Sequence, residues 1–315
     1  MTAIRIATRG SALALAQANL TLAQCQAAFP GEAFEIAIIK TTGDKLQTAS
    51  LASANLPKGL FTKELETALI NGEADIAVHS LKDLPTELPA GLKLGAVSKR
   101  ADVRDVLIIR RGPALNSQLS TLNFLSPGAT VATSSTRRRA QLLDLRPDLN
   151  IVPIRGNVGT RLRKLAEQSE LDAIVLAAAG LERLHFRNGD SAEISGADVP
   201  PGLHATAIPV EQMLPCVGQA ALGIEIREND SRIGRICAAL NDASTFACVT
   251  AERAFLRGMG GGCQLAVGAY GEIMGEQLRL RAISFLGAKP IRGERTDLIS
   301  EATTIGAQLA RELSG

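Results

Sequence analysis

Residues 4–18 read IRIATRGSALALAQA, and the same order of features returns at residues 130–143 (TVATSSTRRRAQLL) and 150–165 (NIVPIRGNVGTRLRKL). In each segment a short apolar run leads into a turn containing Arg with Ser, Thr or Asn, and a helix-period pattern follows. Strands that alternate with helices are typical of α/β domains with largely parallel sheets. We therefore predict α/β architecture from residue 1 to about residue 225, with these three basic turns joining strands to helices.

The same alternation extends between and beyond the three basic turns. It predicts strands at residues 4–8, 34–40, 75–80, 106–110, 130–133, 151–155 and 172–176. It also predicts a helix after Gly59, with an apolar face of Phe61, Leu65, Ala68 and Leu69 and an outward face of Lys63, Glu64 and Glu66. Residues 186–209 are polar and rich in Gly and Pro, so we expect an irregular segment there.

Beyond about residue 243 the pattern changes. A helix is predicted over residues 243–257, then three strand-like runs separated by glycines, then a final helix from about Ser300. The middle run, residues 278–283, alternates with period two, which indicates a half-solvated antiparallel strand. This part is expected to form a separate α+β domain.

The bulk composition excludes several classes of protein. A chain of 315 residues with 34 basic and 32 acidic side chains has a formal charge of only +2, which does not favour a nucleic-acid or membrane-surface partner. The start, MTAIRIATRG, lacks the features of a signal peptide, and five cysteines without regular spacing fit a reducing compartment, so we expect a cytoplasmic protein. The three histidines are scattered, so we expect no metal site.

Each basic turn opens a helix, where unpaired backbone N–H groups and Arg side chains favour an anion. In a parallel sheet these turns lie at the carboxyl ends of strands, where ligands of open α/β folds bind. Taken singly, each turn is equally explained by Ser or Thr capping the helix and Arg facing solvent. Three together favour a multiply anionic ligand, and the planar fork of Arg suits carboxylates or phosphates.

Residues 74–85, ADIAVHSLKDLP, predict a buried strand that ends in Ser80, Lys82 and Asp83. An acid beside a lysine is most often a structural ion pair. In the company of the basic turns, Asp83 has a second interpretation, because a carboxylate kept ionised by nearby cations can stabilise a developing positive charge. The residues alone leave both interpretations open.

Cys263 follows Gly260, Gly261 and Gly262, directly after a helix whose last turns carry Arg253 and Arg257. Three glycines leave the backbone without side-chain cover, so the thiol could meet a ligand closely, although core packing is equally compatible with the pattern. Cys25, Cys237 and Cys248 fall in helical patterns typical of small buried hydrophobic residues, and Cys216 lies in an ambiguous turn.

Nine motifs occur along the chain in the order found in porphobilinogen deaminases, and the chain resembles that family over nearly its whole length. They are RIATRGS, GLFTKELE, DIAVHSLKD, TSSTRRR, RGNVGTRL, AAGLERL, VGQAALGIE, TAERAF and GGGCQ. The resemblance implies an enzyme that condenses four porphobilinogen molecules head to tail, with release of ammonia, to give the linear tetrapyrrole hydroxymethylbilane for porphyrin and haem biosynthesis. The anion is then a chain of pyrroles that carry acetate and propionate arms.

The resemblance also implies a cofactor, a dipyrromethane primer held through a thioether by Cys263, and a catalytic carboxylate at Asp83. The residues that would bind cofactor or substrate are Arg9, Ser11, Gln17, Lys58, Ser80, Lys82, Thr133, Ser134, Ser135, Arg137, Arg138, Arg155, Arg161, Arg183 and Gln219. The implied partners are porphobilinogen and, downstream, uroporphyrinogen-III synthase, and a monomer is expected.

The implied fold has three domains. Residues 1–98 and 217–240 form the first and residues 99–216 the second, two α/β lobes similar to type-II periplasmic binding proteins around a cleft. Residues 241–315 form the third, an α+β domain with a small antiparallel sheet that carries Cys263.

This sequence departs from the family pattern at several positions. Ala12 stands in place of Pro, Ala54 in place of Lys, Pro57 in place of Gly and Ala220 in place of the Gly after Gln219, Cys216 is unusual, and residues 187–209 form a longer stretch. None of these changes removes a chemical group assigned to the reaction.

Two other functions fit part of the sequence. A non-catalytic anion-binding protein on the same two-lobed scaffold would explain the basic turns, but would give no role to Asp83 or Cys263. A phosphate-ester enzyme is disfavoured because neither a G-x-x-x-x-G-K-[ST] loop nor a G-x-G-x-x-G fingerprint is present.

Overall fold

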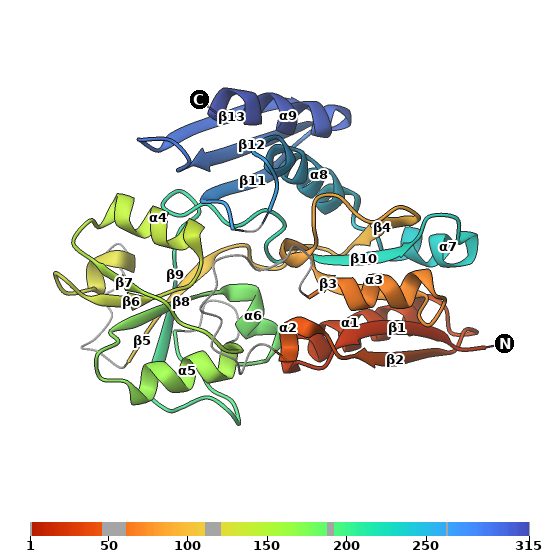
Figure 1. Cartoon of the computed structure of the whole chain (residues 1–315), viewed down its shortest axis with the longest axis horizontal. Helices are drawn as coiled ribbons and strands as arrows, with labels where there is room; N and C mark the ends of the chain where they lie inside the picture. Colours follow the sequence, from red (N-terminus) through yellow and green to blue (C-terminus); the bar gives the residue numbers. More distant parts are fainter. Residues whose placement is uncertain (1, 46–60, 111–120, 188–191, 263, 315) are drawn as a thin grey trace.

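The computed structural model describes residues 2–45, 61–110, 121–187, 192–262 and 264–314. Three sheets, each with its own helices, account for the described chain, and Figure 1 shows them as three parts with the third above the other two. The prediction of two α/β lobes and a C-terminal α+β part with a small antiparallel sheet is confirmed. No helix in the described ranges is long and apolar enough to span a bilayer.

The first sheet has the strand order β2-β1-β3-β10-β4. Its strands are β1 (Ile4–Arg9), β2 (Phe34–Ile39), β3 (Ile76–Ser80), β4 (Leu92–Val97) and β10 (Leu222–Arg227). Its helical elements are α1 (Ala12–Ala28), α2 (Thr42–Lys45), α3 (Lys63–Ile70), the short 3-10 turn η1 (Leu81–Asp83) and α7 (Ser231–Leu240). Strands β1, β2 and β3 are parallel, whereas β10 runs antiparallel to both β3 and β4.

The second sheet has the order β7-β6-β8-β5-β9. Its strands are β5 (Asp105–Arg110), β6 (Thr130–Ala132), β7 (Asn150–Val152), β8 (Ala173–Ala177) and β9 (Leu203–Ala207). The 3-10 turn η2 (Thr121–Phe124) and the helices α4 (Thr136–Leu145), α5 (Val158–Glu167) and α6 (Ala178–Arg183) accompany them. Here β6, β7 and β8 are parallel and β5 is antiparallel to β8 and β9. Each of the two sheets is therefore largely parallel, as predicted, with one antiparallel strand, β10 in the first sheet and β5 in the second.

The third sheet is antiparallel, with the order β11-β12-β13. Its elements are α8 (Ala243–Gly258), β11 (Val267–Met274), β12 (Gln277–Ser284), β13 (Ile291–Leu298), the 3-10 turn η3 (Ile299–Glu301) and α9 (Ala302–Leu313). One apolar cluster joins Phe255 of α8 and Leu309 of α9 to Leu278 and Leu280 of β12. The alternation in the middle run therefore buries one face of the sheet under both helices, as predicted.

Each lobe has apolar clusters on both faces of its sheet. In the first lobe, Ile6 and Val78 pack with Ile233 of α7, while Ala7 and Ala77 pack with Leu65 of α3 on the other face. In the second lobe, Ile108 and Ile174 pack with Leu162 of α5, and Leu142 of α4 belongs to the cluster on the opposite face. These clusters fix the parallel strands and therefore the direction in which their carboxyl ends point.

All seven predicted strands exist, with ends that either coincide with the prediction or differ from it by at most three residues. The expectation of an irregular segment at residues 186–209 is wrong in one place, because β9 lies within it and pairs with β5. The outward position of Glu66 is also wrong. Its side chain is buried on α3, and burial raises its pKa, with the charge of Glu225 acting in the same direction. A carboxyl group in this position keeps its proton more readily than an exposed one.

The chain passes twice between the lobes. It leaves the first sheet after β4 and returns after β9 to add β10 next to β3, through residues 208–221. Glu252 of α8, fully buried, connects both passages to the third part, accepting hydrogen bonds from Arg100 at 2.5 and 3.1 Å and from the backbone N–H groups of Gly218 at 2.8 Å and Gly271 at 2.9 Å. One carboxylate thus holds the two passages and β11 together.

Candidate functional site

The three basic turns lie at the carboxyl ends of β1, β6 and β7, and each leads into a helix whose N-terminus is capped by a side chain. The Ser11 hydroxyl accepts from Ala14 N at 3.3 Å, the Ser135 hydroxyl from Arg138 N at 3.4 Å, and the Asn157 side chain from Thr160 N at 2.8 Å. Capping is therefore a role of Ser11 and Ser135. A hydroxyl oxygen that caps a helix can still donate its proton to a ligand.

The first lobe contributes the ends of β1 and β3. Gln17, buried on α1, donates from Nε2 to the Ser80 hydroxyl at 2.8 Å, and this contact ties α1 to the end of β3. The Arg9 guanidinium lies over the ring of Phe61, 4.2 Å from its centroid. Arg9 and Ser80 thus stand at the ends of two adjacent parallel strands, β1 and β3.

Asp83 ends η1 and its side chain is exposed, while Lys82 is half-buried. Burial lowers the pKa of Lys82; the charge of Asp83 opposes this shift and that of Arg138 adds to it. Because Arg138 belongs to the second lobe, this cation and the Asp83 carboxylate lie close to a charge from the facing lobe. Lys82 and Asp83 therefore stand at the boundary between the lobes.

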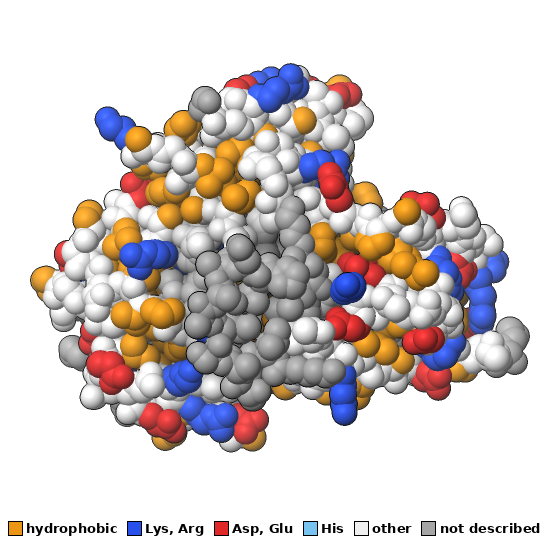
Figure 2. All heavy atoms as spheres, viewed as in Figure 1, with side chains coloured by type: hydrophobic (Ala, Val, Ile, Leu, Met, Phe, Trp, Pro, Cys, Tyr) orange, Lys and Arg blue, Asp and Glu red, His pale blue; other side chains and the backbone are white. Residues whose placement is uncertain are grey.

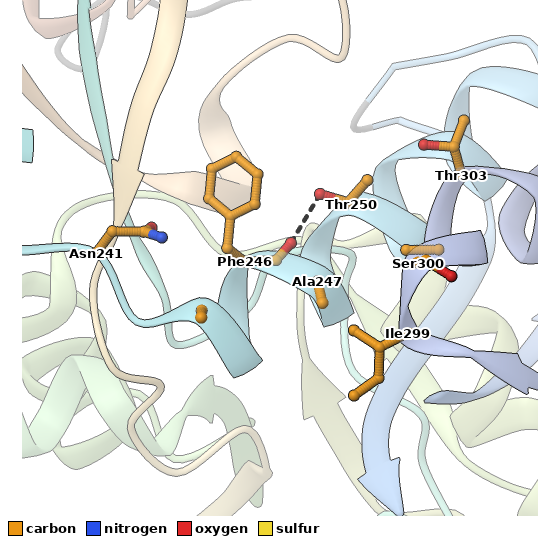
Figure 3. Close-up of a pocket in the computed structure, with 9 residues that line it drawn as sticks. Asn241, Phe246, Ala247, Thr250, Ile299, Ser300 and Thr303 are labelled. Carbon is orange, nitrogen blue, oxygen red and sulfur yellow. Dashed lines mark hydrogen bonds between the residues drawn. The ribbon is translucent and has the colours of Figure 1, made fainter. Parts of the chain in front are cut away.

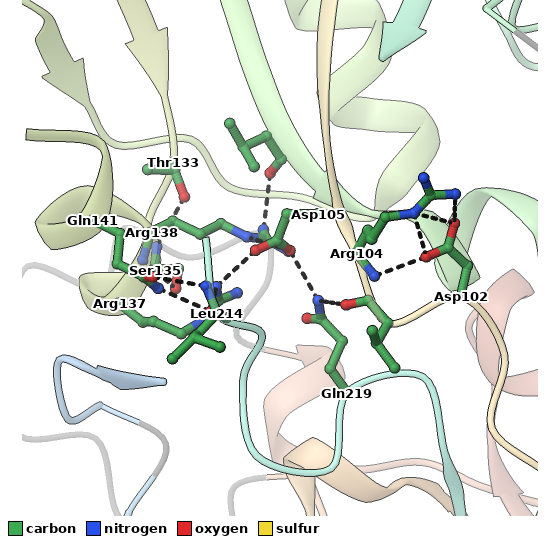
Figure 4. A network of polar contacts seen from close by, with 12 residues as sticks. Asp102, Arg104, Asp105, Thr133, Ser135, Arg137, Arg138, Gln141, Leu214 and Gln219 are labelled. Atoms are coloured by element: carbon green, nitrogen blue, oxygen red, sulfur yellow. Dashed lines mark hydrogen bonds and ion pairs between the residues drawn. The ribbon is translucent and has the colours of Figure 1, made fainter. Parts of the chain in front are cut away.

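A buried carboxylate, Asp105 at the start of β5, organises the second lobe's side of this boundary (Figure 4). Its Oδ2 accepts from Arg137 at 2.7 Å, and its Oδ1 accepts from Arg138 at 2.8 and 3.1 Å and from Gln219 Nε2 at 3.0 Å. Burial opposes the charge of Asp105, but the two guanidinium groups outweigh it and hold the pKa of that carboxyl well below its usual range. Asp105 is thus an ionised anchor for three side chains.

Arg137 and Arg138, which are predicted to bind cofactor or substrate, also have contacts within the protein. Both are buried, and each also donates to a backbone carbonyl: Arg137 to Leu214 O and Arg138 to Val175 O, each at 2.8 Å. Every nitrogen of the Arg138 guanidinium has a protein partner, whereas the buried Nε of Arg137 has none. Because a guanidinium has five N–H donors and Arg138 makes three of these hydrogen bonds, both arginines retain unused donors.

The hydroxyl groups before α4 also have protein partners. Thr133 accepts from Ser135 N at 3.2 Å. Ser134 bridges to the turn after β7, because its hydroxyl donates to Ile154 O at 2.7 Å and accepts from Ile154 N at 3.1 Å. These contacts bring the second and third basic turns side by side. Ser134 is nevertheless exposed, whereas Thr133 is buried.

Three further arginines differ in how many of their guanidinium groups' hydrogen bonds go to protein atoms. Arg155 is exposed, and within the described ranges nothing accepts a hydrogen bond from its guanidinium. Arg161 donates to Gly156 O at 2.8 Å; burial and the neighbouring charge of Arg138 lower its pKa to about 10, against the influence of Asp83. Arg183 donates to Ala220 O at 2.6 Å, and burial lowers its pKa to about 10.

The lowered pKa values of three cationic side chains indicate positive charges that lack both water and counter-charge, and a bound anion would stabilise them. Lys82, Arg161 and Arg183 are all harder to hold as cations than free side chains, mainly because protein replaces their water. A ligand bearing carboxylates would supply the missing counter-charge. The donor set, guanidinium and hydroxyl groups with the unused Nε of Arg137, fits a polycarboxylate such as a short chain of substituted pyrroles.

The segment that returns to the first lobe carries Cys216, Gln219 and Ala220. Gln219 is fully buried, and its Nε2 donates to Val103 O at 2.8 Å as well as to Asp105. Burial raises the pKa of the Cys216 thiol, although the charges of Arg137 and Lys82 act the other way. Gln219 is thus committed to the Asp105 network, and Cys216 lies among the same charges as a neutral thiol.

Ala220 has a backbone φ of 72°, in the left-handed region that favours glycine, at the position where the resemblance leads us to expect glycine. Ala220→Gly should therefore stabilise the protein by about 1 kcal/mol, measured as an increase in melting temperature. Ala221→Gly is the matched control, because Ala221 is equally buried without a positive φ, and should be destabilising. A lower melting temperature for Ala220→Gly than for the parent would contradict the strain argument.

Two predicted site residues, Lys58 and Cys263, lie outside the described residues, as do Ala54 and Pro57. The residues on either side of Cys263 are described. Gln264 O accepts from the Thr136 hydroxyl at 2.7 Å, so this part of the chain adjoins the start of α4.

Sequence reasoning missed Asp105, Arg100 and Glu252. Asp105 is an acid followed by an apolar run, DVLII, which is a visible but weak sign of a charge at a buried strand start. Its partners Arg137, Arg138 and Gln219 are 32, 33 and 114 residues away, so the pattern could not name them.

Figure 2 shows Lys and Arg scattered among Asp and Glu over the visible face. A pocket of about 310 Å³ lies between the first turns of α8 and α9 (Figure 3), but its lining, from Asn241 to Thr303, contains no residue of the candidate site. Among the described residues no cluster of His, Cys, Asp and Glu could hold a metal ion.

Comparison with known proteins finds two family models that together cover most of the chain. The model "Porphobilinogen deaminase, dipyromethane cofactor binding domain" matches residues 4–235, and "Porphobilinogen deaminase, C-terminal domain" matches residues 246–315. Two proteins named porphobilinogen deaminase, from Trichlorobacter lovleyi and Syntrophus aciditrophicus, are each 44% identical to this chain. The matched region spans 98% of this chain and 92% and 94% of those two proteins, respectively.

Solved structures show more distant likenesses. The VFT2 domain of Bordetella pertussis BvgS matches with a TM-score of 0.45 and 17% identity, over 80% of this chain and 91% of that one. The aliphatic sulphonate binding protein SsuA from Escherichia coli matches with a TM-score of 0.39 and 13% identity, over 81% of this chain and 70% of that one.

Proposed function

The chain belongs to the porphobilinogen deaminase family, and from this premise we propose that Asp83, Cys263 and the arginines at the lobe boundary carry out that family's reaction here. The reaction condenses four porphobilinogen molecules onto a dipyrromethane primer and releases ammonia and hydroxymethylbilane. The observation that best supports it is the meeting of Asp83 and Lys82 from one lobe with Arg138 and Arg161 from the other.

The dipyrromethane supplies a pyrrole terminus to be extended, and we propose that Cys263 holds it through a thioether. Arg155 and Arg161 would bind carboxylates of the growing chain, with Arg9, Ser11, Lys58, Ser80, Lys82, Ser134 and Arg183 as further contacts. The contacts within the protein suggest that Arg137 and Arg138 offer their remaining N–H donors to the ligand, whereas Gln17, Thr133, Ser135 and Gln219 maintain the shape of the site.

Asp83 is the group proposed to act on the reacting atoms. Its exposed carboxylate can accept hydrogen bonds from pyrrole N–H groups and stabilise the positive charge that develops as ammonia leaves. The cationic side chains Lys82 and Arg161 lie near this carboxylate, as expected for a site that binds anionic substituents beside the reacting atoms. We therefore propose stabilisation of the developing positive charge as the role of Asp83.

Denaturing intact mass with peptide mapping tests the proposed attachment directly. The purified protein should carry a two-pyrrole adduct on Cys263, and Cys263→Ala should lack both adduct and activity. Cys216→Ala is the matched control, since its thiol is also near the site, and it should keep the adduct. Fully active enzyme with an unmodified mass would rule the attachment out.

Arg155 gives a test of carboxylate binding with little risk to the fold. Arg155→Lys should raise KM about tenfold at unchanged melting temperature, because an ammonium cannot reproduce the two parallel hydrogen bonds of a guanidinium. Arg163→Lys, at an exposed position of α5, the helix that follows Arg155, should leave KM unchanged. If Leu at both Arg155 and Arg161 left primer assembly and turnover intact, the polycarboxylate site would be disproved.

The non-catalytic anion-binding alternative predicts neither an adduct nor turnover, so the mass measurement distinguishes it. Further proposals extend from the family: domain limits of 1–98 with 217–240, 99–216 and 241–315, a monomer in the cytoplasm, and transfer of the product to uroporphyrinogen-III synthase. Analytical ultracentrifugation of the purified enzyme tests whether it is a monomer.

A further inference from the structure

The last turns of α8 lie against the segment that directly follows Asp83. Arg253 donates to Leu84 O at 3.2 Å and to Pro85 O at 2.6 Å, and Arg257 donates to Thr86 O at 3.0 Å. A Cβ on Gly261 would lie 3.5 Å from the Thr86 hydroxyl, so the chain after α8 passes beside the same segment. Three successive carbonyl groups are therefore held by one helix.

Arg253 is an unusual residue to bury for structural reasons alone. Only 8% of it is exposed, and among the described residues no carboxylate lies within ion-pair distance. Burial and the like charge of Arg257 lower its pKa to about 10, with the charge of Glu225 opposing, so it remains a cation at neutral pH. Burying an unpaired cation costs free energy, which its hydrogen bonds to protein groups must offset. The two carbonyl contacts of Arg253 are therefore expected to matter for the segment that they hold.

The held segment forms one side of the η1 turn. On the other side, Leu81 N donates to Ala221 O at 3.0 Å, and within the turn Leu84 N donates to Leu81 O at 3.1 Å. Leu81 and Leu84 are buried in a cluster with Val249 of α8, while Asp83 between them faces solvent. The turn is thus fixed before and after Asp83, and the fixation after it comes from the third part of the protein.

We propose that Arg253 and Arg257 are positioning residues that set the orientation of the Asp83 carboxylate by holding residues 84–86 against α8. The inference rests on the role of Asp83 proposed above. It gives the third part a task in the reaction beyond carrying the attachment cysteine, because α8 then fixes the catalytic turn as well.

The test compares Arg253→Met with Arg110→Met in enzyme already loaded with cofactor. Arg110 also holds backbone carbonyls, those of Leu165 and Leu171, but in the second lobe. Both variants should have a lower melting temperature than the parent. Arg253→Met alone should lose kcat, about 10- to 100-fold, at a KM within about twofold of the parent, since a displaced catalytic group slows the reaction without weakening binding. Arg257→Met, at an exposed position, should also lower kcat at a nearly unchanged KM, but by a smaller factor.

If Arg253→Met and Arg257→Met keep the parent kcat, the inference is overturned. Should Arg253→Met not fold, Arg253→Lys gives the same readout, because an ammonium keeps the charge but loses the fork that reaches two carbonyls. Asp83→Asn, measured in parallel, separates the two proposals. An active Asp83→Asn disproves the role of Asp83 itself, whereas an inactive one beside a fully active Arg253→Met disproves only the positioning.

Discussion

Asp105→Asn is expected to lower the free energy of unfolding by about 3–5 kcal/mol, because it removes the negative charge from between two buried guanidinium groups. Arg137 and Arg138 would keep their carbonyl contacts but face each other without a counter-charge. Gln219 would lose an ionised acceptor at 3.0 Å in the same step. Loading with cofactor should fall together with stability, since these side chains border the proposed binding site.

The pH dependence of this effect distinguishes charge from shape. The pKa of Asp105 is depressed in the folded state, so its contribution to stability is present above the unfolded pKa and disappears as pH falls. Urea unfolding should show the largest difference between parent and variant above about pH 4, and a shrinking difference below it. Asp148→Asn is the matched control, because the Asp148 carboxylate is exposed and pairs with the half-buried Arg146, so its loss should change stability much less. A similar loss in both variants would refute the buried-anchor argument.

The fold was predictable where the pattern is local. Strand-to-helix transitions at β1, β6 and β7 follow from runs such as IRIATR and from the caps Ser11, Ser135 and Asn157. Strand β9 was missed because its sequence, LHATA, is short and only partly apolar, and it exists through pairing with β5, about 100 residues earlier. Glu66 was misplaced because α3 buries both its apolar face and this carboxyl group against β3 and β10.

The site was predictable in its residue types but not in its partners. The sequence indicates that Arg137 and Arg138 open a helix, yet not that Asp105 lies beneath that helix. The proximity of Asp83 to Arg161 depends on the return of β10 to the first sheet and on the packing of the lobes, which are properties of the whole chain. Long-range ion pairs of this kind leave no spacing signal in a single sequence.

For Asp83, a structural and a catalytic role lead to opposite expectations. A structural ion pair of an exposed carboxylate contributes about 0–1 kcal/mol, so Asp83→Asn would change stability slightly and leave turnover intact. If the charge stabilises the developing pyrrole cation, the amide keeps the shape and loses the interaction that matters in the transition state. The exposed position of Asp83, on a turn that is held on both sides, favours the second role.

We therefore expect Asp83→Asn to fold with a near-parent melting temperature and to lose turnover by about 100-fold or more, as removal of a transition-state stabiliser does. The enzyme should be loaded with cofactor before the assay, by reconstitution with hydroxymethylbilane where necessary, so that failed priming is not mistaken for failed elongation. Glu87→Gln is the matched control, since it neutralises an exposed acid four residues away, and it should elongate at the parent rate. Near-parent elongation by loaded Asp83→Asn would exclude a catalytic charge at this position, whereas equal losses in both variants would show that general charge at the turn, rather than this carboxylate, governs the rate.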